Sequence, residues 1–227
     1  METGLDTPIR GSAAPAARSL GERVAALHAA ARVLAQRPRR PRQERLSGLH
    51  NPWGHGGALV DPWLLLDLCE DPEVLDGVEA LIGPDIVLWD TDLYLKAAAY
   101  QRFVKEGREG RYWPATPLQG AVVLVPAGRP ARPLTWMGLA QIAREGLPAL
   151  DPGPPLYVLR YMPATSHFVR DGRAPANWVA MEEQPLINYT TRPLWLMRGE
   201  DRAGSDFVTG FSPPVPRWAG RNQPKEN

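Results

Sequence analysis

The chain has 227 residues and a formal net charge of +1, with 44% hydrophobic and 22% charged residues. This is the composition of an ordinary globular protein, and the near-zero charge argues against nucleic acid as a partner. The 25 prolines and 21 glycines argue against an all-helical bundle and predict many turns and short strands, as in an all-β or mixed fold.

The one cysteine, Cys69, lies in a leucine-rich stretch. A single cysteine rules out an intramolecular disulfide and a zinc cluster built from thiolates, and we expect a buried, inert thiol. The chain has neither an apolar run typical of a signal peptide nor one of about 18 residues that would span a membrane. We therefore predict a cytoplasmic protein that does not act at membranes.

The N-terminal region is predicted to contain two segments. Residues 1–18 are rich in proline and alanine and predict a disordered leader. Residues 19–48 predict an amphipathic helix followed by a basic linker, with Ser19 as N-cap and Glu22 three residues later. The basic run 37–45 is typical of a solvated linker and only weakly suggests phosphate contact.

Two further helices are predicted from a repeated start signal. Asp61 and Asp71 are each followed by proline, which places an N-cap before a proline at the first helical position. Gly83 and Pro84 predict the end of the second helix. The pattern indicates a pair of short helices that bury their leucines and valines.

Strands are expected where β-rich residues follow these helices. Residues 86–95, 121–125 and 156–161 predict strands, and 193–197 a weaker one. The interval 126–155 is instead typical of loop, helix and loop, which indicates that at least one strand of a complete core is missing. An irregular C-terminal arm follows, whose aromatic and arginine residues suit either an interface or packing across the domain.

Three segments resemble the phytanoyl-CoA dioxygenase family of Fe(II) and 2-oxoglutarate oxygenases. They are DPEVLDGVEALIGPDIVLW from Asp71, YWPATP from Tyr112 and LRYMPATS from Leu159, within a resemblance that spans roughly 49–170. The resemblance implies a mixed α and β fold in which N-terminal helices pack on a double-stranded β-helix, or jelly roll, over residues 49–227. The short interval 126–155 makes this jelly roll distorted or trimmed, with edges that a partner or a second copy would cover.

The resemblance also implies where an iron site would lie. Family members hold Fe(II) with two histidines and one carboxylate, and the first histidine and the carboxylate form a His-x-Asp element just before the YW dipeptide. Here Gly107 occupies the histidine position and Glu109 the carboxylate position. Glycine has no ligating side chain, so Glu109 is the main candidate metal ligand, and His167 is a weaker one.

The cosubstrate site implied by the resemblance is also incomplete. The interval from Val125 to Leu156 contains no second iron histidine. Within this interval, Arg144 is a weak candidate for binding the far carboxylate of 2-oxoglutarate. The segment AQIAREGL is more simply interpreted as a helical turn with Arg144 in solvent.

Two functions of different classes follow. The first is a non-catalytic relative that serves as a binding or assembly module for a small hydrophobic ligand, a protein partner or a second copy. The second is an oxygenase of a hydrophobic or carrier-linked small molecule that uses Fe(II) and 2-oxoglutarate, with histidines supplied from elsewhere. A decayed gene product, in which 128–155 has no selected structure, is a third reading.

Overall fold

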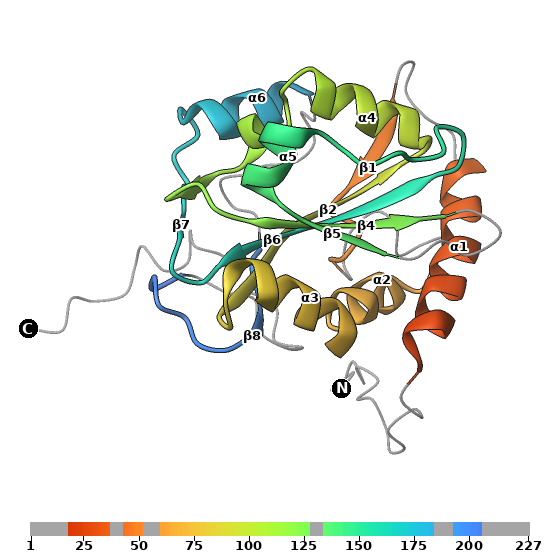
Figure 1. Cartoon of the computed structure of the whole chain (residues 1–227), viewed down its shortest axis with the longest axis horizontal. Helices are drawn as coiled ribbons and strands as arrows, with labels where there is room; N and C mark the ends of the chain where they lie inside the picture. The colour runs from red at the N-terminus through yellow and green to blue at the C-terminus, as the bar shows by residue number, and fades with distance from the viewer. Residues whose placement is uncertain (1–17, 37–42, 52–59, 128–133, 184–192, 206–227) are drawn as a thin grey trace, which may run out of the picture.

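The computed structural model describes residues 18–36, 43–51, 60–127, 134–183 and 193–205. Their strands form one six-stranded antiparallel sheet, with helices on both faces, and a separate two-stranded sheet (Figure 1). The predicted leader and most of the predicted C-terminal arm lie outside the described residues. In the part of the chain that is described, no helix has the length and apolar character needed to cross a membrane.

The large sheet is built around two long, fully buried strands. Its order is β1-β2-β6-β4-β5, and β8 pairs with the end of β2 that β1 leaves open. Because both faces of the sheet are covered by helices, its central strands are apolar almost throughout. The strands are β1 (Arg45–Ser47), β2 (Ile86–Tyr94), β4 (Ala121–Pro126), β5 (Thr135–Gly138), β6 (Leu156–Pro163) and β8 (Trp195–Arg198), and the small sheet pairs β3 (Ala115–Thr116) with β7 (His167–Phe168).

Three helices cover one face of the large sheet: α1 (Leu20–Gln36), α2 (Pro62–Cys69) and α3 (Pro72–Ile82). The Asp61 side chain accepts a hydrogen bond from the Trp63 amide, and Asp71 accepts one from the Glu73 amide. Together with the following prolines, these N-caps explain why both helices start where the sequence predicts.

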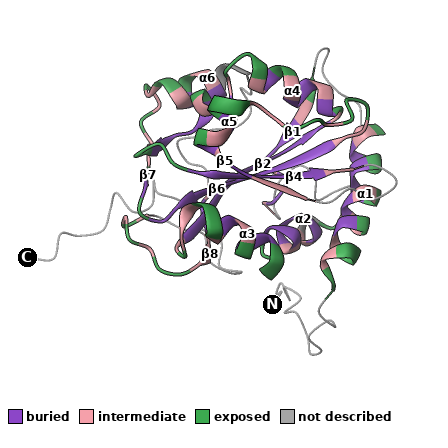
Figure 2. Cartoon of the chain, in the orientation of Figure 1, coloured by how far each residue is buried: buried purple, intermediate pink, exposed green. Residues whose placement is uncertain are grey.

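The opposite face is covered by α4 (Ala97–Lys105), α5 (Leu139–Glu145) and α6 (Pro175–Glu183), with the short 3-10 helix η1 (Gly110–Tyr112) beside them. Figure 2 shows the strands buried between the two helical layers. The sheet therefore has two separate cores, one on each face.

The structure confirms most of the predicted elements. The capping box of α1 is present, because the Glu22 amide donates to Ser19 Oγ and the Ser19 amide donates to Glu22. The loop, helix and loop reading of 126–155 was wrong in one respect, because Thr135–Gly138 forms strand β5 and pairs with β4.

The predicted jelly roll is not confirmed. A jelly roll needs two sheets that face each other, whereas the described residues form one large sheet between helices and a second sheet of only two short strands. No closed barrel occurs among these residues. The mixed α and β class holds.

Candidate ligand cavity beside a buried ion-pair cluster

A bulge in β2 determines which side chains meet on the α4–α6 face. The register between β2 and β6 shifts between Leu88 and Asp90, so that Asp90 lies opposite Arg160 and Asp92 opposite Val158. Paired residues of neighbouring strands point to the same face, and a shift of one residue exchanges the faces. The bulge therefore turns both aspartates toward Arg160 instead of into the core under α1–α3.

Arg160 is the centre of a buried ion-pair cluster. Its Nε donates to Glu109 Oε1 at 2.6 Å and its Nη2 donates to Oε2 at 3.1 Å, so the pair is bidentate. Its Nη1 donates to Asp92 Oδ2 at 2.7 Å and lies 4.0 Å from Asp90 Oδ2. All four side chains are at most 4% exposed.

A second guanidinium extends the cluster toward β1. Arg45 Nη1 donates to the Tyr94 hydroxyl at 3.0 Å and lies 3.5 Å from Asp92 Oδ2. Its guanidinium carbon lies 4.9 Å from the centre of the Phe103 ring and 4.8 Å from that of Tyr112, within range of cation–π attraction. The Ser47 hydroxyl donates to the other oxygen of Asp92.

The cluster keeps its charges in a dry environment. Burial lowers the pKa of Arg160, but the adjacent Glu109 and Asp92 carboxylates outweigh burial and hold that pKa well above its ordinary value. Arg160 is therefore charged at every relevant pH, and it forms its ion pairs with Glu109 and Asp92. Such a pair is costly to break, because either partner alone would be a buried, uncompensated charge.

Glu109 reaches this cluster from the turn between α4 and β3. The backbone after α4 makes a turn at Gly107, where φ is +65°, a conformation that favours glycine. Glu109 then directly precedes η1, and the indole of Trp113 lies with Nε1 3.4 Å from its Oε1. The local turn thus points the carboxylate inward to Arg160 and not out to solvent.

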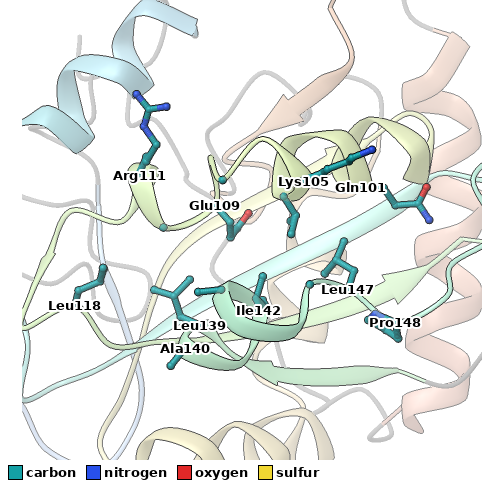
Figure 3. A pocket seen from close by; sticks show the side chains of 15 residues that line it. Gln101, Lys105, Glu109, Arg111, Leu118, Leu139, Ala140, Ile142, Leu147 and Pro148 are labelled. Atoms are coloured by element: carbon teal, nitrogen blue, oxygen red, sulfur yellow. The ribbon is translucent and has the colours of Figure 1, made fainter.

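A cavity of about 850 Å³ lies between α4, η1 and α5, with Glu109 in its wall (Figure 3). Its size is within the range of small-molecule sites, about 300 to 1,000 Å³. The α5 side of the cavity is apolar and includes Leu139, Ile142 and Leu147. Gly107 also lines it, so both positions of the implied His-x-Asp element face the same space.

The other predicted site residues lie elsewhere. His167 is exposed in β7, where it pairs with Thr116 of β3. The Arg144 side chain is 69% exposed at the end of α5 and lies 3.5 Å from Glu145. Neither residue lines the cavity.

The described residues do not fit an iron centre. Among them, no three His, Cys, Asp or Glu side chains are grouped closely enough to hold a metal ion. Both oxygens of Glu109 accept hydrogen bonds from Arg160, and a guanidinium that occupies a carboxylate in this way competes with a metal ion for its lone pairs. We therefore derive no step through iron or 2-oxoglutarate.

The sequence contains a signal for the cluster. Asp90 and Asp92 interrupt the apolar run of β2, and Arg160 interrupts that of β6. Charged residues are almost never fully buried unless they are paired. Opposite charges inside two otherwise apolar strands therefore predict an ion pair between those strands.

Comparison with known proteins identifies no family. No family model matches the chain, and no curated protein matches it. Two solved structures of a non-heme monooxygenase are similar to it. "Non-heme monooxygenase, ThoJ-Ni complex" has a TM-score of 0.41 and 15% sequence identity, and covers 90% of this chain and 86% of its own. "Non-heme monooxygenase; ThoJ apo" has a TM-score of 0.42 and 15% identity, and covers 90% and 85%. We draw no functional conclusion from a likeness at this level.

Proposed function

We propose that the chain is a non-catalytic binding protein whose α4–α5 cavity holds a small ligand with an apolar body. One observation carries the proposal: Glu109, the carboxylate that the sequence suggests as an iron ligand, is bound on both oxygens by Arg160. Beside it, Gly107 leaves open space where a ligating side chain would be needed. Arg160 thus supplies internally the positive charge that a metal ion would bring.

The lining of the cavity supports ligand binding as the function of a chain without an iron site. An apolar lining with a few polar groups is typical of small-molecule sites, and here Ala140, Ile142 and Ala143 of α5 line the space together with Val104 of α4. Burial of an apolar ligand surface would supply roughly 25 cal/mol per Å². The competing proposal is the iron oxygenase that the family resemblance implies. Binding of a protein partner or a second copy stays a prediction.

Metal binding is the first test. The purified full chain is mixed with Fe(II) and 2-oxoglutarate without oxygen, and bound iron and the iron–2-oxoglutarate charge-transfer absorbance are measured. We expect neither iron above background nor the absorbance band. Stoichiometric iron with the band would overturn the proposal, and its loss in Glu109→Gln would identify Glu109 as a ligand. His55, which lies outside the described residues, would then be the first histidine to replace.

Ligand binding is the second test. The neutral fluorophore N-phenyl-1-naphthylamine reports apolar binding sites, and we expect saturable fluorescence enhancement with the full chain. Ala143→Trp should fill the cavity and weaken binding about tenfold or more, because the added indole occupies the space of the probe. Ala29→Trp is the matched control, since Ala29 is an exposed alanine on α1, across the sheet. Absence of binding, or equal loss in both variants, would contradict the proposal.

A further inference from the structure

The rim of the cavity carries positively charged side chains that are absent from its apolar α5 wall. Lys105 and Arg111 both line the cavity and are exposed. Within the described part of the chain, neither side chain takes part in an ion pair. In Figure 3, Lys105 projects from α4 near Gln101, and Arg111 lies on the other side of Glu109. The two cations thus lie toward opposite ends of the cavity.

The charged residues that neighbour the lining residues in the chain occur as pairs. Arg108 lies 2.9 Å from Glu106, Arg144 lies 3.5 Å from Glu145, and the Glu109 carboxylate is compensated by Arg160. Opposite charges at these distances largely cancel at the distance of a ligand. Lys105 and Arg111 remain, so that the mouth has an excess of positive charge while the α5 wall is apolar.

We infer that the cavity takes an organic anion: a ligand with an apolar body that packs against α5 and an acidic group that lies at the rim beside Lys105 or Arg111. This inference rests on the proposed binding function and adds the charge of the ligand to it. A neutral apolar ligand would use the walls but gain nothing from the rim. An organic cation would be repelled by both rim residues.

The position of Glu109 in the cavity wall agrees with this placement of the acidic group. Glu109 is 3% exposed and already paired with Arg160, so the inner wall has no excess positive charge for an acidic group placed deep in the cavity. At the rim the same group stays partly hydrated and meets Lys105 or Arg111. The ligand is therefore oriented with its apolar body inside and its charge outside.

Two probes with the same aromatic body separate charge from apolar contact. N-phenyl-1-naphthylamine is neutral, and 8-anilinonaphthalene-1-sulfonate carries one sulfonate on the same ring system. Each is titrated into the full chain and followed by fluorescence. Binding of the sulfonate should weaken about threefold or more when salt is raised from about 20 to about 300 mM, because rim charges are screened. Binding of the neutral probe should stay within about twofold.

Charge reversal at the rim tests the assignment. We expect Lys105→Glu together with Arg111→Glu to weaken the sulfonate about tenfold or more, and to leave the neutral probe within about twofold. The matched control is Arg18→Glu with Arg32→Glu, which makes the same change of net charge at a position on α1 and at another that lies two residues before this helix, across the sheet. The control should leave both probes unchanged. Circular dichroism checks that each variant is folded.

The outcomes separate this inference from the proposed function. Binding of the neutral probe without binding of the sulfonate, or equal effects of rim and control reversals on the sulfonate, would overturn the anion inference and leave the binding function intact. Failure of both probes to bind would overturn both. Loss of both probes in the rim variant alone, with the chain folded, would show that the rim shapes the cavity and would also reject the charge assignment.

Discussion

The two faces of the large sheet differ in what they bury, although the same strands supply both. The face under α1–α3 is covered by aliphatic side chains, a few aromatic ones such as Tyr157 and Tyr161, and the Cys69 thiol. The face under α4–α6 carries the ion-pair cluster around Arg160 and lies beneath the cavity. In β6, Leu159 points to the first face and Arg160 to the second, because side chains alternate along a strand.

This difference indicates a division of roles. Apolar burial is non-directional and stabilises in proportion to the buried area, so the α1–α3 face is expected to tolerate changes of shape that keep the volume. The buried charges require a particular geometry, since each depends on a partner within about 4 Å. We therefore expect the α4–α6 face to impose a precise arrangement on η1 and on the cavity wall.

Replacement of Arg160 should have the largest effect. Arg160→Met leaves Glu109 and Asp92 buried without their main counter-charge, and we expect a loss of about 3 to 5 kcal/mol in the free energy of unfolding. Urea unfolding followed by circular dichroism measures it. The variant that also carries Glu109→Gln and Asp92→Asn removes the stranded charges and should recover at least about half of the loss. A loss below about 1 kcal/mol in Arg160→Met would contradict the description of a dry cluster.

A substitution that creates a cavity in the apolar face should cause the second largest loss of stability. Leu68 is fully buried among the leucines of α2, and we expect Leu68→Ala to cost about 2 to 4 kcal/mol. Binding of the neutral fluorophore should stay within about twofold, because the α4–α5 cavity is on the other side of the sheet. Val33→Ala, at a position that is 44% exposed, should cost less than about 0.5 kcal/mol. A large loss of binding in Leu68→Ala would show that the two faces are coupled.

Alkaline pH should lower the free energy of unfolding by less than these substitutions do, through a buried tyrosine on each face. Burial raises the pKa of Tyr157, on the apolar face, well above its ordinary value. Burial also raises the pKa of Tyr94, but there the nearby Arg45 and Arg160 act in the opposite direction. Above pH about 10 the unfolded chain releases these protons while the folded chain keeps them, so stability falls with rising pH.

The slope of the free energy of unfolding against pH identifies which tyrosine contributes to the decline. Each buried tyrosine lowers the free energy of unfolding by up to about 1.4 kcal/mol per pH unit until its folded pKa is reached. We expect Tyr157→Phe to flatten the decline between about pH 10 and 11 at least as much as Tyr94→Phe does. Urea unfolding at a series of pH values measures it. An unchanged slope in Tyr157→Phe would contradict the burial effect.

Much of the α1–α3 face was predictable because its signals are local. Asp71 caps α3 through an amide two residues away, and Ser19 and Glu22 cap α1 across three residues. Such hydrogen bonds depend on a few neighbouring residues and not on the rest of the fold. The strands β2, β4 and β6 were likewise indicated by their own apolar, β-rich composition.

Strand β5 is an element that local sequence signals do not predict. Thr135–Gly138 is four residues long and has no apolar run of its own, so the sequence indicated loop and helix. It becomes a strand because Trp136 and Met137 lie opposite Val123 and Val122 of β4, and because the Trp136 indole packs on Gly77 of α3 and donates to the Val74 carbonyl. Those contacts come from distant parts of the chain.

The candidate site divides in the same way. The resemblance to the phytanoyl-CoA dioxygenase family, through the residue spacing before the YW dipeptide, singled out Glu109 and the missing side chain at Gly107. The partner of Glu109 was not predictable from that spacing, because Arg160 lies 51 residues away. Their contact depends on a bulge of one residue in β2 and on its pairing with β6. Capping and apolar patterns act over a few residues, whereas strand register is set by packing of the whole sheet. Only that packing brings Asp90, Asp92, Glu109 and Arg160 together in one buried cluster beside a cavity.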